Sequence, residues 1–155
     1  MIENRKTDYP LMIAQLQSLS EITPYFVPLL SNASAVIYEN MTDLNWAGFY
    51  LVDGEQLVLG PFQGKSACVL IPKGKGVCGT AFEKDEVQRV DDVHQFPGHI
   101  ACDSASNSEI VIPIHCQGKV VGVLDIDSPQ FSRFSKEDEE GLKGLVKTLE
   151  ELIRW

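Results

Sequence analysis

Two pairs of strand-like runs, each joined by a short turn signal, constrain the fold of this chain more than any other feature. The first pair lies in WAGFYLVDGEQLVLG, around Asp53-Gly54, and the second pair, SEIVIPIHC and KVVGVLDID, flanks Gln117-Gly118. Dipeptides of this kind are typical of tight β-hairpins. The two strands of a hairpin run antiparallel and side by side. The chain is therefore expected to contain an antiparallel sheet.

Helical patterns precede the first hairpin. Residues 8–20 carry apolar side chains at helical spacing, which predicts a first helix. The pair Thr23-Pro24 has the pattern of an N-cap followed by a first-turn proline. We therefore expect a second helix from this pair to about Met41.

A further helix ends the chain. Ser135 and Asp138 form a capping-box pattern before an apolar helical repeat. This predicts a helix that begins at Ser135, with Asp138 at the surface. The segment between the hairpins predicts three short elements, a strand at 68–71, a helix at 76–83 and a strand at 87–90.

The order of these elements indicates the fold class. Helix, helix, hairpin, mixed segment, hairpin and helix together favour an α+β fold, with helices packed on one face of a central antiparallel sheet. A chain of 155 residues corresponds to one domain. We expect a single domain over 1–155, with N-terminal helices in 8–41, sheet and loops in 45–130 and a C-terminal helix in 135–154.

Charge and targeting signals narrow the function classes. Acidic residues outnumber basic ones by 22 to 13, so the net charge is −9. That sign disfavours binding to nucleic acid or to anionic lipid. The N-terminus lacks an apolar stretch of signal-peptide length, and no run approaches the ~18 apolar residues of a membrane span. A cytoplasmic location is expected.

Three of the four cysteines lie in glycine-rich, polar stretches, namely Cys68 in GKSACVLI, Cys78 in GKGVCGTAF and Cys102 in PGHIACDSAS. Cysteines kept for packing usually lie within aliphatic elements. Cys78 lies near a predicted helix start, where the helix dipole would lower its pKa. Without Cys-x-x-Cys pairs a metal site is disfavoured, and a reducing compartment makes structural disulfides rare. The pattern indicates thiol chemistry but leaves open whether Cys78 or Cys102 is the nucleophile, whereas Cys116 is expected to be structural.

Acidic residues interrupt an apolar strand in VVGVLDIDS. Alternation along a strand places Asp125 and Asp127 on one face, and the second hairpin would bring Glu109 toward Asp127. Burying such a group is costly unless a cation or a proton is supplied. The three acids could bind an ammonium group, or hold one carboxyl protonated as a general acid. The alternative is a strand end that emerges into solvent.

Aromatic and histidine residues carry weaker signals. Trp46 and Tyr50 in the first hairpin could be core residues or could wall an apolar pocket. The three histidines, His94, His99 and His115, are expected to be turn or surface residues.

Taken together, these motifs resemble the free methionine-(R)-sulfoxide reductases, which are built on a single GAF domain. The resemblance covers nearly everything from residue 45 to 130, through NWAGFYL, LVLGPFQGKSACVLI, GKGVCGTAF, VDDVHQFPGHIACDSASNSEIVIPI and GVLDIDSP. It implies a GAF-like central sheet with helices on one face and a small-molecule pocket on the other. It also implies a cytoplasmic enzyme of oxidative stress that needs neither metal nor cofactor.

The resemblance further assigns roles to single residues. It implies that Cys102 is the nucleophile, Cys68 the resolving cysteine and Cys78 an auxiliary or alternative resolving cysteine. Trp46, Tyr50, Glu109, Asp125 and Asp127 match the substrate-binding set. The implied reaction reduces free methionine-(R)-sulfoxide through a sulfenic acid and an intramolecular disulfide, which thioredoxin and NADPH recycle. A homodimer is also implied as a possible state.

Two other functions remain open. A GAF module can sense a ligand without catalysis, although sensor modules are usually fused to an output domain and 155 residues leave no room for one. A thiol peroxidase would also use a reactive cysteine with a resolving partner, but it would not need the three acids.

Overall fold

The computed structural model describes residues 6–100 and 104–155. Its centre is a six-stranded antiparallel sheet in the order β3-β2-β1-β6-β5-β4. The strands are β1 (Trp46–Asp53), β2 (Gln56–Gly64), β3 (Leu70–Pro72), β4 (Gln88–Val90), β5 (Ser108–Cys116) and β6 (Lys119–Ser128). A short 3-10 turn, η1 (Val93–Gln95), follows β4.

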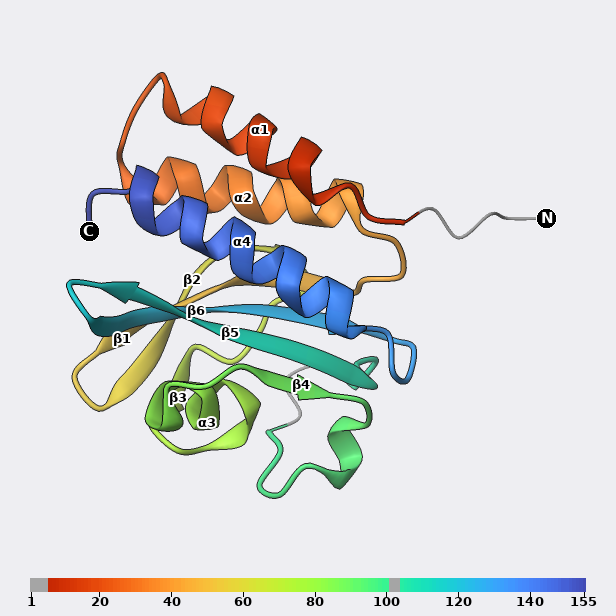
Figure 1. The fold of residues 1–155 in the computed structure, drawn as a ribbon. Coiled ribbons are helices and arrows are strands. Elements are labelled where there is room, and N and C mark those ends of the chain that lie inside the picture. The colour runs from red at the N-terminus through yellow and green to blue at the C-terminus, as the bar shows by residue number, and fades with distance from the viewer. Residues whose placement is uncertain (1–5, 101–103) are drawn as a thin grey trace.

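The helices cover the sheet unequally (Figure 1). Helices α2 (Phe26–Asn40) and α4 (Lys136–Leu152) pack on one face, and α1 (Tyr9–Ser20) completes this helical layer by packing on α2 and α4, whereas α3 (Gly76–Lys84) lies on the opposite side. The predicted α+β fold with a GAF-like antiparallel sheet is confirmed. The expectation that helices occupy one face is met by α1, α2 and α4 and corrected for α3, which packs against β5 and β6 from the other side.

Both predicted hairpins are confirmed. In the first, Asp53 pairs with Gln56, so the turn residues are Gly54 and Glu55, one position later than the sequence signal. Gly54 has a φ of +61°, a backbone conformation that glycine adopts without a steric penalty. In the second hairpin the turn is Gln117-Gly118, as predicted, and both residues have positive φ.

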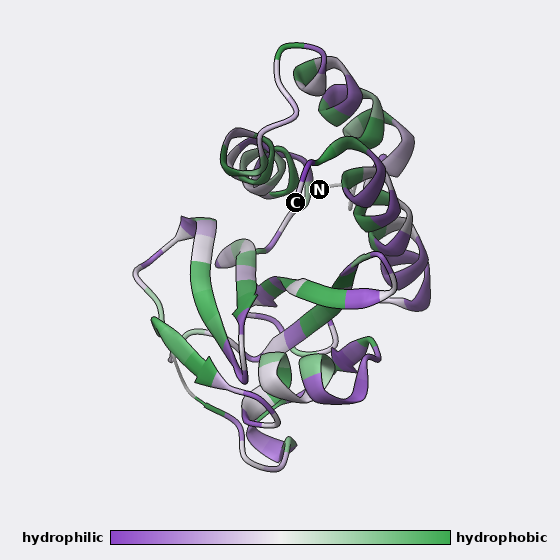
Figure 2. Cartoon of the chain, turned by 90° about the vertical axis from the view of Figure 1, so that its left-hand side faces the viewer, coloured by the Kyte–Doolittle hydropathy of each residue, from purple (hydrophilic) through white to green (hydrophobic). Residues whose placement is uncertain are grey.

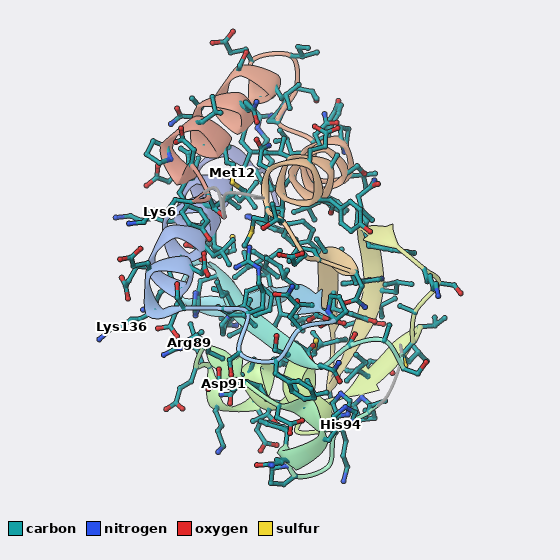
Figure 3. All side chains as sticks on the ribbon, turned by 90° about the vertical axis from the view of Figure 1, so that its right-hand side faces the viewer. Lys6, Met12, Arg89, Asp91, His94 and Lys136 are labelled. Carbon is teal, nitrogen blue, oxygen red and sulfur yellow. The ribbon has the colours of Figure 1, made fainter. Side chains whose placement is uncertain are left out.

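The larger hydrophobic core lies between the sheet and the layer of α1, α2 and α4. In the middle of β6, Leu124 and Ile126 are fully buried in this core. In the helices, Met12 lies between α1 and its neighbours (Figure 3). The helices contribute mainly buried aliphatic residues: Met12, Leu16, Leu29, Leu30, Ala33, Val36, Ile37, Leu142, Leu145, Val146 and Leu149. Figure 2 shows the strands as mostly hydrophobic and the helices as alternately polar and apolar around their turns.

The predicted start of the second helix is two residues too early. Helix α2 begins at Phe26, and the residue before it, Tyr25, has an extended backbone. Tyr25 forms a parallel bridge with Arg154, whose backbone N–H donates to the carbonyl of Pro24 at 3.1 Å. The hydroxyl of Thr23 accepts a hydrogen bond from the N–H of Tyr25 instead of capping a helix. The C-terminal segment thus holds this stretch extended.

The predicted capping box of α4 is confirmed, but Asp138 is not a surface residue. It is only 9% exposed, and it accepts hydrogen bonds from the hydroxyl of Tyr9 at 2.6 Å and from Arg133 at 3.2 Å. The Ser135 hydroxyl accepts from the N–H of Asp138, and the Asp138 carboxylate accepts from the N–H of Ser135. Asp138 therefore ties α1 to the start of α4.

We expect Asp138→Asn to lower the free energy of unfolding at pH 7 by about 2 kcal/mol, because hydrogen bonds to a charged group are lost. Burial alone would raise the pKa of Asp138, but hydrogen bonds from Tyr9 and Ser135 and the charge of Arg133 outweigh it and lower the pKa. A lowered folded pKa contributes stability above the ordinary value of about 3.9, and this is lost as the pH falls further. Urea unfolding measures the free energy of unfolding of the wild type and of Asp138→Asn. The difference between the two proteins at pH 7 should become smaller below about pH 4.

The matched control for this measurement is Glu140→Gln, which changes an exposed acid on the same helix. Its effect should stay within about 0.5 kcal/mol. Equal effects of the two substitutions would contradict the role given to Asp138.

Within residues 6–100 and 104–155, the structure contains no helix both long enough and apolar enough to span a lipid bilayer. The proposed cytoplasmic location remains a prediction.

Candidate functional site

A cavity of about 40 Å³ lies on the face of the sheet opposite α1, α2 and α4, beside α3. Beneath it is a second, smaller cluster of buried apolar residues that includes Val77, Val111 and Val123. The cavity brings together many of the residues that the sequence singled out. Six of these line it, namely Trp46, Tyr50, Cys78, Glu109, Asp125 and Asp127.

The register of three neighbouring strands brings the acids together. Asp127 on β6 pairs with Glu109 on β5 and, on its other side, with Trp46 on β1. Asp125 lies two residues earlier on β6 and opposes Gly48. Because alternate residues share a face and Leu124 and Ile126 are buried against the helices, the acids face the cavity. The predicted approach of Glu109 to Asp127 is confirmed, and the acids are not a solvated strand end.

Burial dominates the electrostatics of the three acids. Glu109 is 7% exposed and Asp125 is 6% exposed. Burial raises the pKa of Glu109 and of Asp127 well above the ordinary range, and the charge of Asp125 raises both further. Burial also raises the pKa of Asp125, although hydrogen bonds with Glu109 and Cys78 oppose this shift. The cluster therefore retains protons that an ordinary carboxyl would lose.

The acids also have unused hydrogen-bonding capacity. Ser106 donates to one oxygen of Asp127 at 3.1 Å. Within the described part of the chain, the other oxygen of Asp127 and the Oδ1 of Asp125 are buried without a hydrogen-bond partner. Buried polar atoms of this kind are rare in proteins. They mark a place that a cation or a hydrogen-bond donor could occupy.

The prediction of a lowered thiol pKa for Cys78 is wrong. Cys78 occupies the first turn of α3, as predicted, but it is buried against the acids. Burial raises the pKa of the thiol well above its ordinary value, and the charges of Asp125 and Glu109 raise it further. The thiol lies 3.9 Å from the Oε2 of Glu109, to which it donates a weak hydrogen bond. Burial and the two acids raise the pKa of Cys78 by more than the helix dipole lowers it, so Cys78 remains a protonated thiol.

The other cysteines differ in their placement. Cys68 packs against the apolar cluster below the cavity and takes part in a disulfide bond. Cys78 and Cys116 are free. Cys116 is half-buried at the end of β5, next to the hairpin turn, and is not part of the cavity lining. Cys102, the predicted nucleophile, lies outside the described residues.

An aromatic wall closes one side of the cavity. Trp46 stacks on Tyr50 with ring centroids 5.8 Å apart, and on Phe62 at 5.2 Å. The indole N–H of Trp46 donates to the carbonyl of Lys65 at 3.1 Å, and the hydroxyl of Tyr50 donates to the carbonyl of Cys68 at 2.9 Å. Both side chains are thus fixed at their polar ends, and their rings face the cavity.

Sequence reasoning missed several cavity residues. His99, expected to be a turn or surface residue, lines the cavity, as do Lys75 and Ser106. The position of His99, three residues before Cys102, was the available signal. Burial and the neighbouring His94 lower the pKa of His99, which favours the neutral ring at pH 7. Figure 3 shows His94 on the side of the sheet away from α1, α2 and α4.

Gly48 is a further residue that the sequence reasoning missed. A Cβ atom at this position would lie 2.3 Å from the Cβ of Phe62 and 2.8 Å from its Cα. Such contacts are far too close, and the Cα cannot move away freely because β1 and β2 are paired there. Only glycine therefore allows Phe62 to support the ring of Trp46.

We expect Gly48→Ala to destabilise the protein by about 1–3 kcal/mol, because the added methyl group forces the paired strands apart. The matched control is Gly144→Ala in α4, where the nearest atom to the new Cβ is Ile13 Cδ1 at 3.8 Å. Alanine is favoured over glycine in a helix by about 1 kcal/mol, so this control should stabilise the protein. Thermal unfolding of both variants tests the pair, and a stable Gly48→Ala protein would count against the tight contact.

Comparisons with known proteins extend over nearly the whole chain. The sequence pattern of the GAF domain matches residues 28–153. A free methionine-R-sulfoxide reductase from Escherichia coli strain K12 is 60% identical over 128 residues, which are 83% of this chain and 78% of that protein. The reduced form of fRMsr from Staphylococcus aureus superposes with a TM-score of 0.94 at 49% identity, covering 99% of this chain and 100% of that one. The free methionine-R-sulfoxide reductase of Neisseria meningitidis, in complex with its substrate, gives 0.90 at 40% identity, covering 98% and 94%.

Proposed function

This chain belongs to the GAF-domain family of free methionine-R-sulfoxide reductases, and from this we propose that it reduces free L-methionine-(R)-sulfoxide to L-methionine. The observation that carries the proposal is the group of Glu109, Asp125 and Asp127 beside the aromatic wall, in which Glu109 and Asp125 are buried and Asp127 is half-buried with one buried oxygen. A free methionine sulfoxide carries an ammonium group, which the acids could bind, and an apolar end, which the aromatic wall could hold.

The acids would bind the amino group of the substrate. An ammonium ion supplies the positive charge that clustered, buried carboxylates need before they can ionise together. It also brings three N–H donors for acceptors such as the unpartnered oxygens of Asp125 and Asp127. A methionine within a polypeptide has no such charge at its nitrogen, so this arrangement favours the free amino acid.

The wall would hold the apolar end of the substrate. Trp46 is fixed by its hydrogen bond and by stacking against Tyr50 and Phe62, so its ring offers a flat, rigid surface. Contacts between sulfur and an aromatic ring are favourable, by about 0.3–1.5 kcal/mol. The methyl and sulfur groups would therefore lie between this ring and the acids.

The acids would also supply the proton that the reaction requires. A sulfoxide sulfur becomes electrophilic when its oxygen is protonated or strongly hydrogen-bonded. The raised pKa values of Glu109 and Asp127 keep a protonated carboxyl available near neutral pH. One acid can thus donate to the sulfoxide oxygen while a nearby carboxylate holds the ammonium.

Cys102 would then attack as the thiolate. The sulfoxide oxygen passes to the Cys102 sulfur, methionine leaves, and the enzyme carries a sulfenic acid. The thiol of Cys68 displaces water from that sulfenic acid and forms a Cys68–Cys102 disulfide. The disulfide state of Cys68 supports this role, and the raised pKa of Cys78 supports a secondary role for that thiol.

An external dithiol would restore the two thiols. We expect thioredoxin to serve, since it transfers two electrons by disulfide exchange without a cofactor bound to this protein. Directly after Cys68, Val69 is 63% exposed, and Leu70, the first residue of the edge strand β3, is 54% exposed. This apolar surface suits the docking of a protein partner beside the disulfide.

The test is an NADPH-coupled assay with thioredoxin and thioredoxin reductase. NADPH should be consumed with free methionine-(R)-sulfoxide and much less with hydrogen peroxide. Consumption with peroxide alone would instead identify a thiol peroxidase. Absence of turnover with either compound, in protein that still binds free methionine, would identify a ligand-binding module.

A further inference from the structure

One group in the cavity has the composition of a metal site. Ligand atoms of Cys78, Glu109 and Asp125 all lie within 4.8 Å of one another. All three side chains are buried, each being less than a tenth exposed. They come from α3, β5 and β6, so the sheet and a helix packed on it hold them together.

A second observation points to a positively charged occupant. Asp125 is only 6% exposed, and its Oδ1 has no hydrogen-bond partner in the described ranges. A buried acid with an unused oxygen is costly unless a proton or cation satisfies it. Among the residues that line the cavity, Lys75 is exposed, whereas Glu109 and Asp125 are buried.

The spacing fits a small, soft cation. Zinc binds sulfur at about 2.3 Å and carboxylate oxygen at about 2.1 Å, which in a tetrahedron places sulfur and oxygen roughly 3.6 Å apart. The Cys78 sulfur lies 3.9 Å from Glu109 Oε2, so only a small shift is needed. Magnesium and calcium require six or more oxygen ligands and do not favour a thiolate.

We propose that this cavity binds one zinc ion through the Cys78 sulfur and the Glu109 and Asp125 carboxylates, with water as the fourth ligand. Binding exchanges the Cys78 thiol proton and any carboxyl proton for the metal, and nothing is oxidised or reduced. The cavity of about 40 Å³ has room for an ion and a water molecule. The same two carboxylates cannot then receive an ammonium group, so zinc and a free amino acid exclude each other.

Cadmium binding to the oxidised protein tests the site directly, because a cadmium–thiolate bond absorbs in the ultraviolet. In this state Cys68 is disulfide-bonded, whereas Cys78 and Cys116 are free. One equivalent of cadmium should produce the band. Cys78→Ser should abolish it, and Cys116→Ser should leave it unchanged. A band that persists in Cys78→Ser, or no band in the wild type, overturns the proposal.

Zinc titration calorimetry supplies a second measurement that does not depend on thiol absorption. We expect one site, with affinity reduced at least about tenfold in Asp125→Asn and in Glu109→Gln, since each removes a charged ligand. The exposed acid Asp91, changed to Asn, is the matched control and should bind zinc as the wild type does. Equal affinities in all variants, or magnesium binding as tightly as zinc, would rule out this ligand set.

Only the exclusion of the amino acid rests on the proposed function, and it is measured separately. At free zinc concentrations corrected for the zinc–methionine complex, excess free L-methionine should still weaken zinc binding by at least about tenfold, as expected for a shared site. Zinc binding that L-methionine does not affect would leave the metal site in place and contradict the ammonium site. Binding of free L-methionine by protein that gives no cadmium absorption would do the reverse, since it would keep the ammonium site and contradict the metal site.

Discussion

Free L-methionine-(R)-sulfoxide will be turned over at least about 30-fold faster, in kcat/KM, than its N-acetyl derivative. Acetylation removes the positive charge and leaves the buried Glu109 and Asp125, and Asp127 beside them, without their cation. Leaving buried charged groups unpaired costs about 2–5 kcal/mol, which corresponds to about 30-fold to several-thousand-fold. Assays of the two compounds at equal thioredoxin concentration measure this ratio.

The S epimer provides the stereochemical control for the same assay. One fixed acid, one fixed thiolate and one apolar slot beside Trp46 can serve only one arrangement around a chiral sulfur. We therefore expect little turnover of L-methionine-(S)-sulfoxide and almost none of oxidised protein. Similar rates for the free and N-acetylated compounds would contradict the proposed binding of the ammonium group by the acids. This conclusion would not depend on the roles of the cysteines.

Cys102→Ser will lose even a single stoichiometric turnover, because the Cys78 thiol, which also lines the cavity, is held protonated. Cys68→Ser should instead complete one turnover and accumulate a sulfenic acid, since its resolving thiol is missing. Rapid-quench measurement of methionine, without any reductant, counts the turnovers, and dimedone traps the sulfenic acid. Cys116→Ser is the matched control and should behave as the wild type.

A full single turnover in Cys102→Ser would show that Cys102 is not the nucleophile and would point to Cys78 instead. The electrostatics of Cys78 argue against that result, because burial and two neighbouring acids raise its pKa. Resolution by Cys78 in Cys68→Ser would appear as a disulfide in place of the trapped sulfenic acid. Peptide mapping after dimedone treatment separates these two outcomes.

Local patterns predicted the parts of the site that lie on single strands. The alternation of residues in β6 was enough to place Asp125 and Asp127 on the same face. It did not tell which face is the core, because Leu124 and Ile126 could equally have faced solvent. The packing of α1, α2 and α4 decides this, and it depends on segments at both ends of the chain.

The wrong predictions share one physical cause, which is contact between residues distant in sequence. A helix start alone lowers a thiol pKa, but Cys78 meets Glu109 and Asp125, which β5 and β6 bring across from the sheet. Thr23 has the sequence of an N-cap, but the pairing of Tyr25 with Arg154 holds that stretch extended. Neither contact leaves a signal in the local residue pattern.

The alternation in β6 divides this strand into two independent sets of residues. Even-numbered positions such as Leu124 and Ile126 pack under the helices and keep the protein folded. Odd-numbered positions such as Asp125 and Asp127 face the cavity and determine what can bind. New ligands could therefore be selected by changing odd positions alone, without repacking the core. A one-residue insertion would instead exchange the two sets and lose folding and binding together.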